Sequence, residues 1–259
     1  MAVLKSPREI ELMRAAGRIV HQVHEKMREM IRPGIKVEEL GAVAEEMILS
    51  AGGEPLFKGV TSPATKFPFP SAICASVNDE VVHGIPNGRI LVEGDVISVD
   101  CGVRLKGYCG DAANTFPVGR ISPEAQRLLE VTLGTLDLAI EEMRPGRLWS
   151  EVAELMQKHV ESAGFSVVRE FVGHGIGQQM HEEPKVPNYT DRRQRKQDFR
   201  LEPGLVLAVE PMVNAGSREV KSGDSSGWPQ VTKDGSLSAH FEHTIAVTSD
   251  GVCLLTDGR

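Results

Sequence analysis

The sequence has few cysteines, no excess of basic residues and no uninterrupted apolar run at its N-terminus. Four cysteines in 259 residues, with no C-x-x-C pair, exclude a disulfide framework and a zinc knuckle and indicate reduced thiols. The 29 basic and 36 acidic residues give a net charge of −7, which excludes a basic DNA-binding footprint over the whole chain. Charges at Lys5, Arg8 and Glu9 exclude a signal peptide or membrane span there. We therefore expect a cytoplasmic protein with no DNA or membrane partner.

What the sequence does contain is a repeated helical pattern. With 41% hydrophobic residues, the chain can form one large domain or two small ones. The helix-ending segment Arg32-Pro33-Gly34 recurs as Arg144-Pro145-Gly146, at an offset of 112 residues. We interpret this recurrence as an internal duplication of roughly residues 6–116 and 122–255 within a single domain, 1–259, of the α+β class, with helices packed on a curved antiparallel sheet. Apolar spacing and capping residues predict helices over Pro7–Ile31, over Lys36–Ala51, from Ser122-Pro123 to Arg144, and over Ser150–Ala163.

The segment from Val96 to Phe116 is typical of a β-hairpin with one acidic residue on each strand. Its alternating, β-branched pattern breaks at Leu105-Lys106-Gly107 and then resumes. If the turn is centred between Leu105 and Lys106, Asp100 faces Asp111 directly, whereas a bulge at Gly107 would put the two acids on opposite faces. Directly opposed carboxylates repel each other. Either a divalent cation lies between them, or they are ordinary solvated turn residues.

A glycine-flanked histidine provides a second indication of a metal site. The glycines on both sides of His174 allow the backbone to approach a ligand closely, although a lone histidine could also be a core residue. An oxygen-rich set with one imidazole suits Mn(II), Fe(II), Co(II) or Zn(II), and five ligands fit two ions that share bridging carboxylates and acidify a water between them. The reaction implied is hydrolysis. The five candidate metal ligands are Asp100, Asp111, His174, Glu210 and Glu242.

Five motifs, in order, resemble those of the type I methionine aminopeptidases over nearly the whole chain. They are V-N-D-E-V-V-H-G-I-P from Val77, the acidic hairpin, F-V-G-H-G-I-G from Phe171 followed by His181, V-E-P-M from Val209 and F-E-H-T from Phe241. The resemblance implies the pita-bread fold, a pseudo-twofold α+β duplication. It also implies a metal-dependent aminopeptidase that removes the initiator methionine from nascent proteins when the second residue is small, by attack of a water or hydroxide that bridges the metals. Two divalent ions, Co, Mn, Fe or Zn, would be bound, with Asp111 and Glu242 as bridging ligands, Asp100 completing one site, and His174 and Glu210 completing the other.

The same resemblance assigns roles to the remaining site residues. His181 would steady the scissile carbonyl, His83 would contact the leaving amide, and Glu210 would move a proton from the water to the departing nitrogen. The substrate amine would bind the metal on the Asp100 side, which requires a free N-terminus. By the same resemblance, three residues would line a pocket for the methionine side chain: Phe69, Cys74 and Trp228. For Phe69 and Cys74, ordinary core packing is the alternative.

Some positions depart from the family pattern. Met180 replaces a common aromatic residue, His240 stands where glutamine is usual, and the loop from Phe57 to Pro70 lacks the usual tyrosines. Because residues i and i+2 of a strand share a face, His240 should look toward the metals. It could be a further ligand, but we favour a supporting hydrogen-bond donor. The basic stretch Tyr189–Arg200 is interpreted as a solvated loop, with phosphate binding as the alternative.

Two other functions compete with this interpretation. A proline-specific aminopeptidase or dipeptidase of the same superfamily would use a similar ligand set, but usually has an additional N-terminal domain, whereas here the ligand domain begins close to Met1. A type II enzyme would have a helical insertion, for which His181 to Glu210 is too short. A non-catalytic peptide-binding module would have lost ligands, and none of the five is missing. We therefore expect a monomeric hydrolase acting on N-terminal Met-X peptides of nascent chains, and transient ribosome association is left open.

Overall fold

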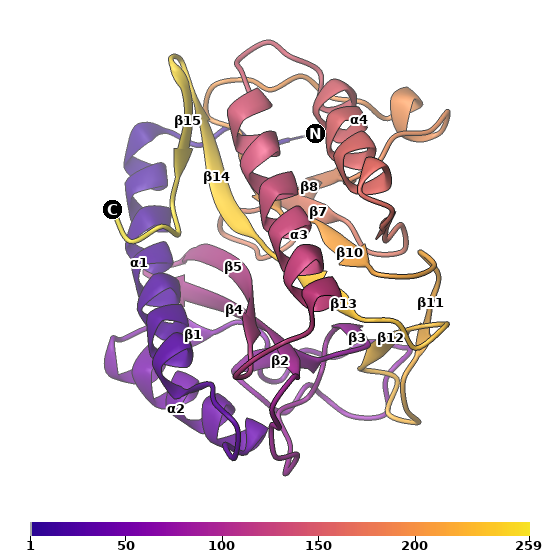
Figure 1. Ribbon diagram of the computed structural model, residues 1–259. Helices are drawn as coiled ribbons and strands as arrows, with labels where there is room; N and C mark the ends of the chain where they lie inside the picture. Colours follow the sequence, from indigo (N-terminus) through magenta and orange to yellow (C-terminus); the bar gives the residue numbers. More distant parts are fainter. Residues whose placement is uncertain (1) are drawn as a thin grey trace.

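Four α-helices form two consecutive pairs in a computed structural model that describes residues 2–259, and a short 3-10 helix, η1 (Gln194–Lys196), lies between β8 and β9 (Figure 1). Ser6 caps the first helix, because its hydroxyl accepts from the Glu9 N–H and the Glu9 carboxylate accepts from the Ser6 N–H. Ser122 caps the third helix by accepting from the Ala125 N–H at 3.1 Å. The sequence-based bounds of all four helices are therefore correct to within about two residues. The helices are α1 (Pro7–Met30), α2 (Val37–Ser50), α3 (Pro123–Glu142) and α4 (Trp149–Ser162).

Every strand pairing between these helical layers is antiparallel. One sheet has the order β1-β4-β2 with β5 also paired to β4, and a five-stranded sheet has the order β15-β14-β9-β7-β8. Two smaller sheets have the orders β13-β10-β6 and β11-β12-β3. Helices α1 and α2 pack on the first sheet, whereas α3 and α4 pack on strands of the second half (Figure 1). The strands are β1 (Glu54–Pro55), β2 (Ile73–Val77), β3 (Glu80–Val82), β4 (Val96–Leu105), β5 (Tyr108–Pro117), β6 (Ser166–Val167), β7 (Gly173–Gly175), β8 (Glu182–Val186), β9 (Val206–Val209), β10 (Met212–Asn214), β11 (Val220–Ser222), β12 (Gln230–Thr232), β13 (Ser238–His240), β14 (His243–Thr248) and β15 (Gly251–Leu254).

The hairpin of β4 and β5 has a different register from the predicted one. Leu105 pairs with Tyr108, so Lys106 and Gly107 form the turn, with φ angles of 50° and 85°. This is the positive-φ geometry of a two-residue hairpin turn. Asp100 therefore pairs with Ala113, and Asp111 pairs with Gly102. The prediction that the two acids directly oppose each other was wrong, but the shift is a whole two-residue period, so both acids still share one face as diagonal neighbours.

A pair of reciprocal hydrogen bonds joins the two halves of the fold. The Thr244 hydroxyl of β14 donates to the Asp111 carbonyl at 2.8 Å and accepts from the Asp111 N–H at 3.0 Å. The N–H of Glu242 donates to the Ala113 carbonyl at 2.9 Å. These bonds place β5 beside the β13–β14 segment, so residues more than a hundred positions apart in sequence meet at one point.

Each helix pair buries a separate apolar cluster, one against β2, β4 and β5 and the other against strands of the second half. Helices α2 and α4 each have 14 residues and begin 112 positions apart, at Val37 and Trp149. We keep the internal duplication of residues 6–116 and 122–255 as our interpretation of this correspondence. Among residues 2–259, none of the helices combines the length and hydrophobicity needed to cross a bilayer.

Candidate metal centre

A cavity of about 280 Å³ lies between the two halves and is lined by every candidate site residue identified in the sequence. The first half of the chain contributes acids from β4 and β5, and the second half contributes His174 of β7 and residues after β9 and β13. The sequence-derived residues that line the cavity are Phe69, Cys74, His83, Asp100, Asp111, His174, Met180, His181, Glu210, Trp228, His240 and Glu242.

Three of the candidate ligands form a compact group in the lining of the cavity. One donor atom from each of Asp111, His174 and Glu242 lies within 4.8 Å of the others. Glu210 is adjacent, with its Oε1 3.6 Å from His174 Nε2. Asp100 lies on the same face of the hairpin as Asp111. The five side chains therefore converge on a space in which their oxygens and one ring nitrogen could contact common ions.

Carboxylate oxygens in this group are buried without a partner. Within the part of the chain that the structure describes, Asp100 Oδ1, Asp111 Oδ1 and Glu242 Oε1 make no hydrogen bond. An unsatisfied buried polar atom costs about 1–3 kcal/mol, and more when it is charged, so such atoms rarely collect in one place without a ligand. Hard oxygen donors with one imidazole fit a divalent cation. The residues present thus suit a metal site.

Burial also raises the pKa values of these acids. Desolvation, with the neighbouring carboxylates as the next cause, raises the pKa values of Asp100 and Glu242 well above their usual range. The same two causes raise the pKa of Asp111 to about 8. Burial raises the pKa of Glu210 to about 7, opposed by the nearby His174. Four acids that resist ionisation together would be stabilised as carboxylates by two divalent charges.

His174 is oriented as a neutral imidazole with one nitrogen free. Its Nδ1 lies 2.9 Å from the Gly175 carbonyl, which can only accept, so Nδ1 carries the proton. The lone pair is then on Nε2, the nitrogen that faces Glu210. Burial lowers the pKa of His174 and so favours the neutral form. A metal-binding histidine is commonly held in this way by a backbone carbonyl.

Two further histidines border the cavity. His181 lies at its mouth, with its ring centroid 4.4 Å from that of His174 and nearly perpendicular to it. His83 has a positive φ of 60°, which is uncommon outside glycine, and packs edge-on against Phe171 at 5.5 Å. Burial lowers the pKa values of both, that of His83 to about 4. Both are therefore neutral at pH 7 and can donate or accept a hydrogen bond.

Another part of the cavity lining is apolar. Phe69 meets Trp228 edge-on, with ring centroids 5.1 Å apart, and Trp228 Nε1 donates to the Phe67 carbonyl at 2.8 Å. Cys74 lies in the same buried cluster, and burial raises the pKa of its thiol well above its usual range, so it remains neutral. Phe57 completes this cluster but was not predicted from the sequence, because the loop that contains it has no periodic pattern.

His240 lines the cavity, as its position two residues before Glu242 predicted. Its side chain is buried, Nε2 has no hydrogen-bond partner among residues 2–259, and this atom lies 3.6 Å from Glu210 Oε2. Burial lowers its pKa to about 3. The backbone of His240 is fixed by Thr115, whose hydroxyl lies within 2.9 Å of both the His240 N–H and carbonyl. The imidazole is therefore held beside Glu210.

A family model and individual proteins of known name both match this sequence. Residues 11–249 match the model of metallopeptidase family M24. The chain is 49% identical over 256 residues to methionine aminopeptidase 1 of Bacillus subtilis and 46% identical over 256 residues to the methionine aminopeptidase of Clostridium perfringens, with 99% of each chain covered in both cases.

Solved structures extend the comparison to the fold. The crystal structure of methionine aminopeptidase from Thermotoga maritima superposes with a TM-score of 0.92 at 39% identity and 99% coverage of both chains. A prolidase from Pyrococcus furiosus matches with a TM-score of 0.74 at 20% identity, over 98% of this chain and 65% of that one. The expected pita-bread fold is confirmed.

Proposed function

Because the chain belongs to the type I methionine aminopeptidases of metallopeptidase family M24, we propose that it removes the initiator methionine from polypeptides whose second residue is small. The observation that carries this proposal is the composition of the cavity. Metal-binding groups lie together in its lining, and a buried apolar cluster that includes Phe69 and Trp228 lines the same cavity. His181 lines this cavity too, so it is available to contact the carbonyl of a bound peptide.

We assign the metal ligands to Asp100, Asp111, His174, Glu210 and Glu242 and infer two divalent ions. Four carboxylates balance the charge of two such ions, and the orphaned oxygens of Asp100, Asp111 and Glu242 give each of these acids a free donor. Bound metal would supply an acidified water and polarise the scissile carbonyl.

The chain's own residues would orient the substrate and move the proton. Glu210, placed between His174 and His240, would accept a proton on a carboxylate oxygen and deliver it to the departing nitrogen. The neutral His181 at the mouth would donate to the carbonyl oxygen as negative charge develops there. His83, held by Phe171 and by its strained backbone, would contact the leaving amide.

The apolar cluster would accept the methionine side chain. Phe69 and Trp228 offer ring edges and faces to the thioether, and Cys74 adds a neutral thiol. The free amine of the substrate would bind the metal on the Asp100 side, which would require an unblocked N-terminus.

We further infer that the protein works as a monomer in the cytoplasm, on chains leaving the ribosome. Its four cysteines are free, three of them buried, which suits a reducing compartment. Analytical ultracentrifugation of the purified protein would test the monomer, and co-sedimentation with ribosomes would test association.

The decisive experiment compares two peptides. Metal-reconstituted protein should release methionine from Met-Ala-Ser and leave Ala-Pro peptides intact. Asp111→Asn should abolish release and lower the bound metal, measured by atomic absorption, because one carboxylate donor is lost. Preferential cleavage of the proline-linked peptide would instead identify a proline-specific peptidase.

A further inference from the structure

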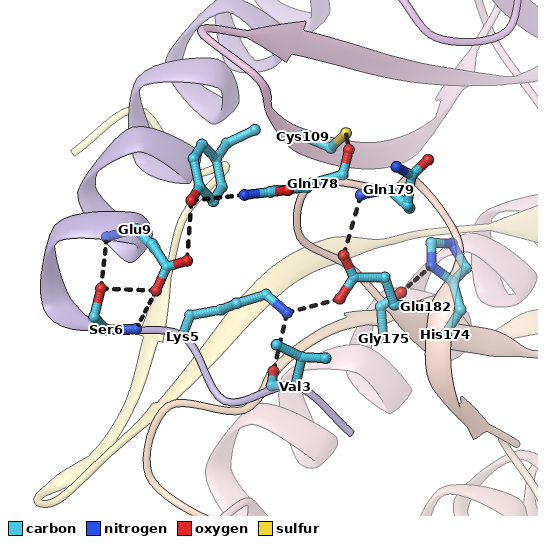
Figure 2. Close-up of polar contacts among 11 residues, drawn as sticks. Val3, Lys5, Ser6, Glu9, Cys109, His174, Gly175, Gln178, Gln179 and Glu182 are labelled. Atoms are coloured by element: carbon cyan, nitrogen blue, oxygen red, sulfur yellow. Dashed lines mark hydrogen bonds and ion pairs between the residues drawn. The ribbon is translucent and has the colours of Figure 1, made fainter. Parts of the chain in front are cut away.

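The loop that carries His181 is held from behind by the first residues of the chain. Residues 176–181 join β7 to β8, and Glu182 is the first residue of β8. Figure 2 shows the Lys5 side chain reaching the Glu182 carboxylate, with Lys5 Nζ 2.7 Å from Glu182 Oε2. The two side chains are only 3% and 15% exposed. They form a nearly buried ion pair that lies outside the cavity.

Both partners of this pair are tied to the backbone. Glu182 Oε1 accepts from the N–H of Gln179 at 3.1 Å, so the carboxylate also fixes the loop itself. Lys5 Nζ donates to the Val3 carbonyl at 2.9 Å, and the Lys5 N–H donates to the Gly204 carbonyl at 2.7 Å, just before β9. Lys5 is therefore a fixed anchor, and Glu182 connects the loop to it.

Gly177 indicates how closely the pair is packed under the loop. A Cβ at this position would lie 2.3 Å from Lys5 Cε and 2.6 Å from Glu182 Oε1. Atoms cannot approach this closely, so a larger residue would displace the ion pair. The absence of a side chain at Gly177 is what allows the loop to rest on the lysine.

Glu182 and the catalytic candidate His181 are consecutive residues. Consecutive side chains at a strand point to opposite sides, and here Glu182 faces Lys5 while His181 lines the cavity. We propose that the Lys5–Glu182 ion pair is a positioning device that sets the direction of the His181 imidazole relative to the scissile carbonyl. This proposal rests on the proposed aminopeptidase function.

The other end of the loop has separate support. Gln178 Nε2 donates to the Tyr108 hydroxyl at 3.1 Å, and that hydroxyl donates to Glu9 Oε1 at 2.9 Å (Figure 2). The N–H of Cys109 donates to the Gly177 carbonyl at 2.8 Å. Loss of the ion pair should therefore release the segment from Gln179 to Glu182 and leave the rest of the loop attached.

Lys5→Met tests the proposal, because methionine keeps an unbranched apolar stem and removes the ammonium. The expected result is a fall in kcat for Met-Ala-Ser of about 10-fold to 100-fold with a small change in KM, since misplacement of a positioning group by a fraction of an ångström acts mainly on the transition state. Lys5→Arg keeps the cation but adds bulk to a packed position, so it should recover part of this loss. Glu182→Gln should match Lys5→Met.

Two variants control for charge and stability. Lys26→Met removes another lysine, whose ion pair with Glu29 at 2.9 Å is exposed on α1, and should leave kcat unchanged. Ser122→Ala removes the cap of α3, far from the loop, and should lower the unfolding temperature without altering kcat. The double variant, Lys5→Met with Glu182→Gln, leaves no charge unpaired. Its fold-loss in kcat should therefore be smaller than the product of the fold-losses in the two single variants.

Amide hydrogen exchange gives a readout that needs no substrate. Exchange at residues 179–182 should quicken in Lys5→Met and not in Lys26→Met. If the wild-type protein failed to cleave Met-Ala-Ser, the proposed function would be refuted. Amide exchange would still show whether the ion pair restrains residues 179–182. Unchanged exchange and kcat in Lys5→Met, or a kcat loss equal to the unfolded fraction, would overturn the proposal. If Lys5→Met does not fold, Glu182→Gln decides the same question, because it retains the acceptor for the Gln179 N–H.

Discussion

The metal-free protein should become more stable when one of its buried acids is made neutral. Asp111→Asn is the clearest case, because burial and then the charge of Glu210 raise the Asp111 pKa from 3.8 to about 8. At pH 7 the folded protein therefore holds a proton that the unfolded chain has released. At about 1.4 kcal/mol per pH unit, this difference lowers the stability at pH 7 by at most about 4 kcal/mol.

The pH dependence has a definite sign. The stability associated with Asp111 is fully present below pH 3.8, where both states are protonated, and is lost as the pH rises to about 8. Asparagine carries no proton to lose, but its amide must still be buried, so we expect a net gain of about 2 kcal/mol at pH 7. The gain should fall to zero at about pH 5 and become a loss of about 2 kcal/mol near pH 4, where only the cost of burying the amide remains.

Urea denaturation in the presence of a chelator, at several pH values, measures this gain. Asp250→Asn, an exposed substitution of the same chemistry, is the matched control and should change nothing. Excess Mn(II) or Co(II) should reverse the order, since metal at about 100 times its Kd adds about 2.7 kcal/mol to the protein that binds it. An Asp111→Asn variant that in chelator is destabilised at pH 7, or whose gain is independent of pH, would refute the reasoning.

Three further substitutions test the other assigned roles. His240→Ala should weaken metal binding about tenfold in titration calorimetry, as expected for loss of a donor behind the ligands, whereas loss of one bound ion would make His240 a ligand. Phe69→Ala should lower kcat/KM for Met-Ala-Ser about 30-fold through loss of apolar contact worth about 2 kcal/mol, and an unchanged value would remove Phe69 from the methionine pocket. His181→Ala should lower kcat about 100-fold in steady-state assays with metal content intact, and a parallel loss of metal would contradict a role confined to the carbonyl.

Local sequence patterns were sufficient to predict the helices and the hairpin of β4 and β5. Capping residues indicated where α1 and α3 begin, because an N-cap acts within a few residues, and Ser6 and Ser122 cap these helices in the structure. The hairpin register was missed because the pattern alone did not reveal that Lys106 would join Gly107 in the positive-φ region. A turn shifted by one position moves every cross-strand pair, although here the acids kept a common face.

The sequence indicated candidate residues for the site but not the contacts that support them. The candidate ligands were found because motifs carry them, and the structure brings them to one cavity. The contact of Lys5 with Glu182 joins residues 177 positions apart, and no spacing rule indicates such a pair. The strained backbone of His83 likewise depends on packing against Phe171 and Trp228.

The hydrogen bonds between Asp111 and Thr244 have a consequence for biosynthesis. The cavity requires β5, made early, and β14, made near the end, to lie side by side. When only about the first two hundred residues have been synthesised, β14 is missing and the cavity cannot be complete, even if the helices have already formed. Activity should begin only when the last strands have emerged from the exit tunnel. An incompletely synthesised copy of this enzyme therefore cannot process other nascent chains.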